Sequence, residues 1–375
     1  MNRSIDDSPL AAHDFVLVTN TFWGEAPRIR HQVARLLRNA GGRVLFLERP
    51  ARIGGAVTGP LPNPESGIWL GRGECLLHHQ LRVVPPLHHL DAWVTSRSLA
   101  AVVDAWKPRD DFVIINFAPD AFFLSDAFPG HRIVTIIHDD FEAQSRLPWS
   151  SHIRWSLERT CRQSDHILAV SEPLVERLSN CCSPELLLPW TESEYRVPSR
   201  PSSDRRSLLF WGFVDTGLDL EVVEEIADHL SWLGPEWRLL VVGPTQGKGV
   251  RPRIERRLLP RPNVEILGPH RLDQLPIDDV LAAVLPYRRS RITDAVTLAN
   301  KSMQLLANGL PLLISAMPRF VRAPFVIRLD GPGGVAEAVR TASRDFDSLQ
   351  PVIERFCTQN SAKSRLATLT RACGI

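Results

Sequence analysis

Short apolar runs alternate with stretches of helical periodicity along the whole chain. In the first half, five such runs contain mostly β-branched or large apolar residues. Runs that are apolar at every position are typical of strands in a parallel sheet, because helices cover both faces of that sheet. The predicted strands are Phe15–Val18, Val44–Leu47, Phe112–Ile115, Ile133–Ile137 and Ile167–Val170, and the predicted helices between them include Arg28–Ala40 and Ser150–Arg162.

A polar stretch, Val197–Ser207, interrupts this pattern. It holds two prolines, four serines and three arginines, a composition that favours a linker. The alternation then resumes with Leu208–Trp211, a helix over Asp219–Leu233, Arg238–Val242, Asn263–Leu267, Val280–Leu285 and Leu312–Ser315. The pattern predicts an α/β protein with two Rossmann-like, doubly wound domains, residues 1–198 and 199–358, followed by a last helix within residues 359–375.

The segment Ala283–Ser315 is the most informative part of the chain. A predicted strand ends near Pro286, an arginine-rich loop follows, and a helix is predicted over Thr297–Asn308. Gly309 lies where a helix end favours a left-handed residue, and Pro311 prevents continuation of the helix. The loop arginines are Arg288, Arg289 and Arg291.

Lys301 lies near the start of this predicted helix. Of the 44 basic residues only Lys107, Lys248, Lys301 and Lys363 are lysines, so a lysine here is an unusual choice. The free N–H groups of a helix start favour anions. A lysine beside three arginines at a strand-to-helix junction predicts a diphosphate site, and the alternative is a solvated basic helix start.

The sequence from Lys301 to Ser315 resembles the donor-site motif of GT-B glycosyltransferases. The matching residues are Lys301, Gln304 and the turn Asn308–Pro311, and the form with glutamine resembles the xanthan-type glucuronosyltransferases. Retaining family-4 enzymes carry two glutamates at the positions of Val296 and Gln304, so their ribose-binding carboxylate is not carried over. The resemblance implies a GT-B fold with the active cleft between two domains, and a last helix that crosses back onto the first domain.

The resemblance further implies a nucleoside-diphosphate sugar, most commonly a UDP-sugar, as donor substrate and no separate cofactor. The donor-binding residues would be Arg288, Arg289, Arg291, Lys301, Ser302, Met303 and Gln304, together with Gly212, Phe213 and Gly243 after two strands. A glycine after a strand lets a phosphate approach the backbone closely. Val241–Gly249 is not a phosphate-binding P-loop, because the spacing of its glycines is wrong and Gly249 follows Lys248.

The loop after the strand Ile133–Ile137 begins with His138, Asp139 and Asp140. Residues just beyond a strand's carboxyl end line the ligand crevice in open α/β sheets. Transfer of a sugar to a hydroxyl needs a base for the acceptor proton. Asp139 best matches the catalytic aspartate of the glucuronosyltransferases, with Asp140 capping the next helix or holding the loop. The alternative is that this acidic pair only caps a helix.

The first strand leads into a loop with Trp23, Gly24 and Pro27, and then into a basic helix start with Arg28 and Arg30. In relatives this region faces the acceptor, which implies acceptor binding by Trp23, Gly24, Arg28 and Arg30. A basic helix start can contact a lipid-linked diphosphate or the anionic membrane surface that carries it. The alternative is a plain structural helix, since Ile29, Val33, Leu36 and Leu37 form an apolar stripe.

No convincing metal site is present in the sequence. Cys75, His78, His79, His88 and His89 match no standard zinc spacing, and Val83–Pro86 between the histidine pairs suggests a strand and turn. Asp345 and Asp347 form an Asp-x-Asp motif, but they lie in a polar segment away from any predicted strand end and are expected at the surface. We therefore expect a metal-independent enzyme.

Composition sets the remaining limits. A net charge of +2 gives no case for nucleic-acid binding, and 44% apolar with 23% charged residues is typical of a soluble globular protein. The absence of a signal-like segment and of CxxC spacings predicts reduced thiols and a cytoplasmic location, with contact at the inner-membrane surface as a further option.

Together these features predict an inverting transferase acting on a glycan or lipid-linked acceptor in bacterial surface-polysaccharide assembly. Two rival functions remain open. One is a nucleotide-sugar 2-epimerase on the same fold, and the other is a catalytically inactive GT-B protein that only binds a partner.

Overall fold

The computed structural model describes residues 10–25, 28–56, 58–64, 66–77, 87–144, 150–331 and 333–375. It divides the chain into two compact units. The first unit extends to Leu188 and also includes Ala362–Ile375, and the second unit is Pro189–Ser361. The predicted domain boundaries were residues 198 and 358.

The first unit contains an eight-stranded sheet in which β4 and β5 pair antiparallel and the other pairs are parallel. The strand order is β10-β9-β8-β7-β1-β2-β5-β4. Strands β2, β4 and β5 lie on one side of β1. The chain then crosses to the other side of β1, where β7, β8, β9 and β10 follow in order, so the switch point lies between β1 and β7. The strands are β1 (Asp14–Val18), β2 (Arg43–Leu47), β4 (Thr58–Pro62), β5 (Trp69–Arg72), β7 (Phe112–Asn116), β8 (Ile133–Ile137), β9 (His166–Ala169) and β10 (Glu185–Leu186), and a separate pair is formed by β3 (Ala51–Arg52) and β6 (Glu74–Cys75).

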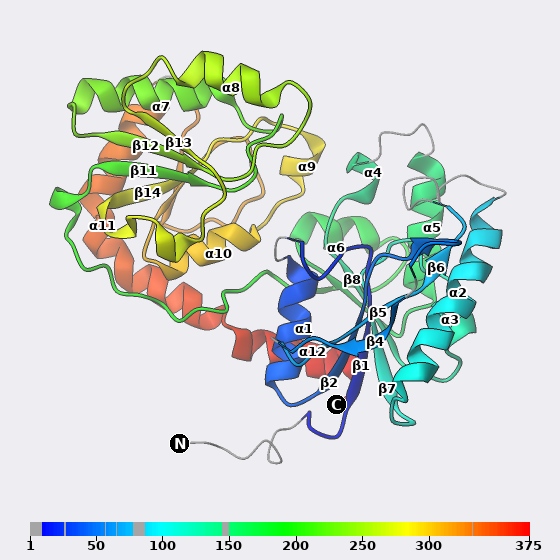
Figure 1. Cartoon of the computed structure of the whole chain (residues 1–375). Helices are drawn as coiled ribbons and strands as arrows, with labels where there is room; N and C mark the ends of the chain where they lie inside the picture. Colours follow the sequence, from blue (N-terminus) through cyan, green and yellow to red (C-terminus); the bar gives the residue numbers. More distant parts are fainter. Residues whose placement is uncertain are drawn as a thin grey trace. The chain divides into compact units, whose positions relative to one another are not determined.

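Helices from both ends of the chain complete the first unit. They are α1 (Ile29–Asn39), α2 (Leu87–Trp106), α3 (Leu124–Ala127), α4 (Phe141–Gln144), α5 (Ser150–Arg162), α6 (Glu172–Leu178) and α12 (Ala362–Cys373). The C-terminal helix α12 packs against α1, β8 and β9 (Figure 1). Arg132 Nε donates a hydrogen bond to the Ala372 carbonyl at 2.8 Å, which ties the chain end to this unit.

The second unit contains a parallel six-stranded sheet with the order β13-β12-β11-β14-β15-β16. The chain reverses between β11 and β14, which makes their carboxyl ends the switch point where ligands bind in open α/β sheets. Its strands are β11 (Ser207–Trp211), β12 (Arg238–Val242), β13 (Val264–Leu267), β14 (Val280–Leu285), β15 (Leu312–Ile314) and β16 (Val326–Arg328), and its helices are α7 (Leu220–Leu233), α8 (Val250–Leu258), α9 (Arg291–Asp294), α10 (Asn300–Ala307) and α11 (Gly334–Gln359).

Every strand that was predicted from an apolar run within the described residues is present, with its ends within one residue of the prediction. All six positions of β14 are buried, as expected for a central strand with helices on both faces. The edge strands β4, β10 and β16 and the strands β3, β5 and β6 were not predicted, because they carry few buried apolar residues. The long helix α11 was also missed, and it places Asp345 and Asp347 on a helix on either side of the fully buried Phe346.

The predicted linker Val197–Ser207 does not separate the two units. It belongs to the second unit, and its Arg205 is fully buried. The Arg205 guanidinium donates hydrogen bonds to the carbonyls of Arg200 (3.1 Å), Ile277 (3.2 Å) and Val280 (2.6 Å) and lies 4.5 Å from the Phe346 ring centroid. The polar composition of this segment therefore did not indicate that it is packed. An arginine can be buried when carbonyl oxygens accept the hydrogen bonds of its guanidinium.

We expect the substitution Arg205→Met to destabilise the second unit by about 3 kcal/mol, because it leaves buried carbonyls without their donor. Chemical denaturation followed by circular dichroism measures this loss. Arg256→Met on the exposed side of α8 is the matched control and should change stability by less than about 0.5 kcal/mol. Equal effects of the two substitutions would contradict the structural role of Arg205.

Candidate functional site

The predicted donor residues of the second unit gather beyond the carboxyl ends of β11, β12 and β14. Gly212 follows β11, Gly243 follows β12, and Tyr287 and Arg288 follow β14. Lys301 comes from the start of α10. We call Gly212, Gly243, Tyr287, Arg288 and Lys301 the donor cluster.

The loops that contain Gly212 and Gly243 pack closely against each other, and Gly212 packs against Lys301. A side chain at Gly243 would place its Cβ 1.8 Å from the Gly212 carbonyl oxygen, and the φ angle of Gly243 is +144°. A Cβ at Gly212 would lie 2.7 Å from Lys301 Nζ. Both positions therefore require glycine for close packing of the loops and of Lys301.

Lys301 is held tightly in this cluster. Its Nζ hydrogen-bonds the Tyr287 hydroxyl and lies 4.4 Å from the centroid of the Tyr287 ring and 5.1 Å from that of Phe210. Burial lowers the pKa of Lys301 to about 8, although nearby Asp215 favours the charged form. The ammonium is therefore mostly protonated at pH 7 and is poorly hydrated, a state in which a bound anion interacts with it strongly.

Helix α10 begins later than predicted, at Asn300 instead of Thr297, so Lys301 is its second residue. The N-cap residue Ala299 offers no side-chain acceptor for the first-turn N–H groups. A helix start without such a cap retains the partial positive charge that favours an anion.

The other predicted residues on α10 divide by helix face. Gln304 is half-buried and shares a face with Lys301, because residues three apart are neighbours on a helix. Ser302 and Met303 have no exposed surface. Their side chains pack into the interior, because they lie on the buried face of the helix, and donor binding by these two residues stays a prediction.

The three loop arginines also differ. The Arg288 N–H donates to the Gly217 carbonyl at 2.9 Å, which joins the loops after β14 and β11, and its side chain is half-buried. Arg289 is exposed and lies 3.5 Å from Asp294, and Arg291 is exposed at the start of α9. Phe213, after Gly212, is half-buried. Tyr287 was not predicted, although it is one of two tyrosines in the chain and directly follows a strand-ending proline.

In the first unit, His138, Asp139 and Asp140 follow β8. The His138 side chain is 7% exposed, and its Nε2 lies 3.7 Å from Asp139 Oδ2. Burial, with a contribution from Arg30, lowers the pKa of His138 to about 3, so the imidazole is neutral at pH 7. A neutral ring fixed beside Asp139 can orient that carboxylate.

The Asp139 carboxyl is partly exposed and has a raised pKa. Its side chain is 38% exposed, and burial of the remainder raises its pKa to about 6. Arg30, Arg28 and a hydrogen bond with Gln144 act in the opposite direction and keep the carboxylate charged at neutral pH. A carboxylate with a pKa near the working pH combines the correct protonation state with useful basicity.

Asp140 has a structural role in this geometry. It is buried, and its Oδ1 accepts a hydrogen bond from the Ala143 N–H at 3.1 Å, which caps α4. The same oxygen lies 2.5 Å from Arg177 Nη1 on α6. These contacts hold the loop that carries Asp139, so Asp140 itself is not in a position typical of a base that must exchange a proton with substrate.

The predicted acceptor residues lie partly beside Asp139. Arg28 is the exposed N-cap of α1, whereas Arg30 is only 5% exposed, and both interact electrostatically with Asp139. Burial lowers the pKa of Arg30 to about 10. The predicted basic helix start is therefore divided: Arg30 is buried and Arg28 is exposed, and acceptor binding by these arginines stays a prediction.

Trp23 belongs to the wall of this region. Its backbone N–H donates a hydrogen bond to Glu48 Oε1 at 2.7 Å. Its ring packs against His31 (5.2 Å between centroids) and Phe46 (5.1 Å). Gly24 beside it is exposed, and Pro27 lies outside the described residues. The ring is thus fixed in place by neighbours on α1 and β2.

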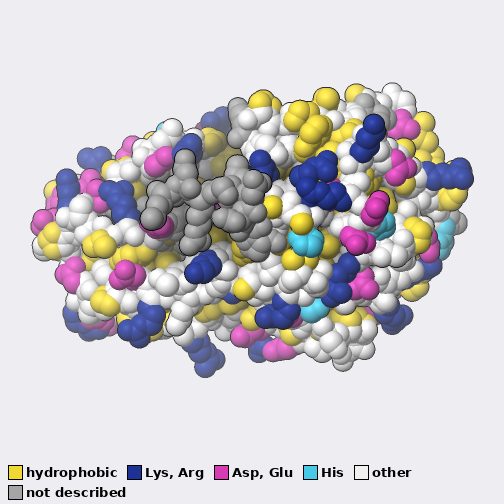
Figure 2. Space-filling model, turned by 90° about the horizontal axis from the view of Figure 1, so that it is seen from below, with side chains coloured by type: hydrophobic (Ala, Val, Ile, Leu, Met, Phe, Trp, Pro, Cys, Tyr) yellow, Lys and Arg dark blue, Asp and Glu magenta, His cyan; other side chains and the backbone are white. Residues whose placement is uncertain are grey.

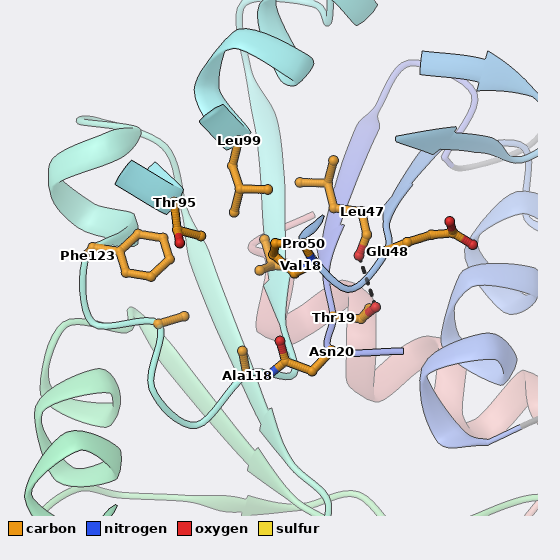
Figure 3. A pocket seen from close by; sticks show the side chains of 11 residues that line it. Val18, Thr19, Asn20, Leu47, Glu48, Pro50, Thr95, Leu99, Ala118 and Phe123 are labelled. Carbon is orange, nitrogen blue, oxygen red and sulfur yellow. Dashed lines mark hydrogen bonds between the residues drawn. The ribbon is translucent and has the colours of Figure 1, made fainter. Parts of the chain in front are cut away.

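A small cavity lies at the carboxyl ends of β1, β2 and β7, next to the Trp23 loop (Figure 3). Apolar side chains of Leu47, Leu99 and Phe123 form part of its wall. Thr19 Oγ1 donates to the Leu47 carbonyl at 2.9 Å across it, and Glu48 lines it as well as binding the Trp23 N–H. The cavity lies at the switch point of the first sheet and has room for about one water molecule.

Only part of the histidine and cysteine group noted in the sequence lies within the described residues. Cys75 is buried, with Sγ 3.7 Å from the Pro50 carbonyl, while His78, His79 and Val83–Pro86 lie outside the described residues. Within the described ranges, no group of three or more His, Cys, Asp or Glu side chains could hold a metal ion. Asp345 pairs with Arg344 at 2.8 Å on the outer side of α11.

Surface charge and hydropathy add two observations. Basic and acidic side chains are interspersed on the face drawn in Figure 2, without one continuous basic stripe. Within the part of the chain that the structure describes, no helix is long and apolar enough to cross a membrane.

Comparison with known proteins found similar solved structures but no similar sequence. Neither a protein-family model nor a curated protein sequence matches the chain. Three similar solved structures each cover 96% of this chain: a trehalose-6-phosphate synthase studied for glycosyltransfer with retention (13% identity, 99% of its chain, TM-score 0.64), the lipopolysaccharide outer core galactosyltransferase WaaB (13%, 98%, 0.61), and HepE of Anabaena in complex with UDP and glucose (9%, 99%, 0.61). At these identities the likeness shows the fold, which is GT-B with two Rossmann-like domains.

We expect Lys301→Ala to weaken binding of UDP at least tenfold, about 1.4 kcal/mol, and to leave uridine binding nearly unchanged. In the parent protein, UDP affinity should also fall as the pH rises above about 8, because Lys301 then loses its proton. Titration calorimetry at several pH values measures both effects.

Lys363→Ala, at an exposed lysine on α12, is the matched control and should bind UDP like the parent. A pH dependence that survives in the Lys301→Ala variant would assign the titration to another group. Equal UDP affinity of parent and variant would remove Lys301 from the site.

Proposed function

Starting from the GT-B fold, we propose that this protein is a glycosyltransferase that moves a sugar from a nucleoside-diphosphate sugar to a hydroxyl of a glycan or lipid-linked acceptor. The observation that carries the proposal is the position of the Lys301 ammonium. The ammonium lies against Gly212, at a helix start and at the switch point of a parallel sheet. These three features each favour a diphosphate.

The donor cluster would bind the diphosphate and stabilise it as it leaves. Negative charge grows on the leaving diphosphate when its bond to the sugar breaks, and a preorganised cation lowers the energy of that state. Lys301 supplies such a cation, and the first turn of α10 adds backbone N–H groups. A UDP-sugar is the preferred donor, because a structural neighbour, HepE, is described with UDP and glucose.

Asp139 would activate the acceptor. Its carboxylate takes the proton of the attacking hydroxyl, while Arg30 keeps it ionised and His138 orients it. Attack opposite the diphosphate inverts the anomeric configuration. One structurally similar protein, a trehalose-6-phosphate synthase, is described as transferring a sugar with retention of configuration. The anomeric configuration of the product is therefore a decisive measurement.

A role in bacterial surface-polysaccharide assembly, from a cytoplasmic position, completes the proposal. It is supported by the structural neighbour WaaB, a lipopolysaccharide outer core galactosyltransferase. The two rival functions give different results on a panel of UDP-sugars and acceptors. A 2-epimerase would isomerise the donor without an acceptor, and an inactive binding protein would bind UDP without transfer or hydrolysis.

Asp139→Asn should lower turnover by about 10²–10⁴ while donor affinity stays unchanged, because the substitution removes basicity and preserves shape. In the parent enzyme the rate should fall as the pH drops below about 6, since protonation of Asp139 removes the base. Steady-state kinetics over pH 5–8 and NMR of the product's anomeric proton measure these effects.

Asp140→Asn is the control for this prediction. It should lower stability by about 1–3 kcal/mol through the lost cap and the lost Arg177 pair, and it should keep most of the turnover of the folded enzyme. The roles are exchanged if Asp140→Asn is inactive and Asp139→Asn is active. A product that retains the donor's configuration would refute the base assignment.

Chelation should leave transfer nearly unchanged, because Lys301 and the start of α10 would provide the charge that a metal provides elsewhere. The test measures initial rates with and without EDTA, followed by addition of magnesium or manganese. Complete loss of transfer in EDTA and its recovery with metal would overturn this expectation and the role of Lys301.

A further inference from the structure

The first unit has an exposed aromatic surface formed by the start of α2 and the adjoining face of α5. Leu87, Leu90 and Trp93 of α2 are 45%, 52% and 52% exposed, and Trp155 of α5 is 38% exposed. Large apolar side chains are usually buried, and a group of them on one surface indicates a binding role. We call this group the α2–α5 surface.

The side chains form one continuous surface. Residues three apart share a helix face, so Leu87, Leu90 and Trp93 lie along one side of α2, while Asp91, Thr95 and Leu99 are buried on the other side. His89 lies on the exposed side, and its ring centroid is 5.8 Å from that of Trp155. His89 therefore connects the apolar side of α2 to Trp155.

Arginines accompany both tryptophans. The Arg97 guanidinium lies 4.4 Å from the Trp93 ring centroid, and that of Arg159 lies 5.4 Å from the Trp155 ring centroid. The only acid in residues 87–97 is the buried Asp91, and the only acid in residues 150–159 is Glu158, which pairs with Arg162 at 3.2 Å. Within these two segments the arginines outnumber the acids, so the surface combines large apolar side chains with a net positive charge from its own helices.

This combination matches the chemistry of an anionic lipid surface. Tryptophan rings favour the headgroup level of a bilayer, where their apolar body is buried and their N–H stays hydrated. Arginines near an anionic leaflet add electrostatic attraction to it. A neutral glycan would use the aromatic rings but would gain little from the arginines.

We propose that the α2–α5 surface docks the first unit onto an anionic bilayer, with Leu87, Leu90, Trp93 and Trp155 at the interface and Arg97 and Arg159 among the lipid headgroups. The sequence had suggested the start of α1 for such a contact, but Arg30 and His31 are buried there. The contact does not depend on glycosyl transfer, so it can be tested without any substrate.

Co-sedimentation of the full chain with lipid vesicles tests the proposal. The parent should bind vesicles of phosphatidylcholine and phosphatidylglycerol, bind phosphatidylcholine alone more weakly, and lose binding as salt rises. Leu90→Ser combined with Trp93→Ser should lower the partition coefficient at least about tenfold, because it removes two large apolar side chains from the interface. Arg97→Glu should reduce binding to the anionic vesicles only.

Trp232→Ser is the matched control, because Trp232 on α7 is 80% exposed and lies in the second unit. It should bind vesicles like the parent, and circular dichroism should show all variants folded. Arg97→Glu retains every apolar group and keeps the test valid if the double variant is unstable.

Three results would overturn the proposal. The parent could fail to bind anionic vesicles, or the double variant and Arg97→Glu could bind as well as the parent. Size-exclusion chromatography could instead show a self-associated parent and a monomeric double variant, which would make this surface an interface between copies of the chain.

Discussion

A parallel sheet that is covered on both faces can present polar chemistry only where its strands end, and both units depend on this constraint. All five residues of β8 and all six of β14 are buried. The first titratable groups appear just beyond them, at His138 and Asp139 in one unit and at Tyr287 in the other. Because all parallel strands of a sheet end at the same edge, residues far apart in sequence meet there.

Three cations differ in how their charge is satisfied: Arg205 and Arg30 are buried, and Lys301 is half-buried. Arg205 donates to three backbone carbonyls, so its charge is satisfied within the second unit. Lys301 has one hydroxyl partner and a lowered pKa, and Arg30 is buried beside Asp139 with a lowered pKa. A desolvated cation that lacks a full set of partners retains the capacity to bind an anion or to tune a neighbouring carboxylate.

The donor cluster also depends on how closely the backbone packs. The Gly212 and Gly243 loops leave no space for a side chain, and Lys301 lies against Gly212. Gly212, Phe210 and Tyr287 therefore surround the ammonium of Lys301 on α10. Such preorganisation reduces the reorganisation needed when a ligand binds.

The sequence by itself determined the strands, the two α/β halves and the residues with unusual chemistry. Apolar runs are local features, so they identified the central strands of both sheets except β5, and the scarcity of lysine identified Lys301. Only the tertiary structure decided which side chains meet. It placed Tyr287 against Lys301 and Arg30 near Asp139, buried Ser302 and Met303, and packed Arg205 within a segment that resembled a linker. The physical reason is that burial and pKa depend on neighbours far apart in the chain, which no local pattern encodes.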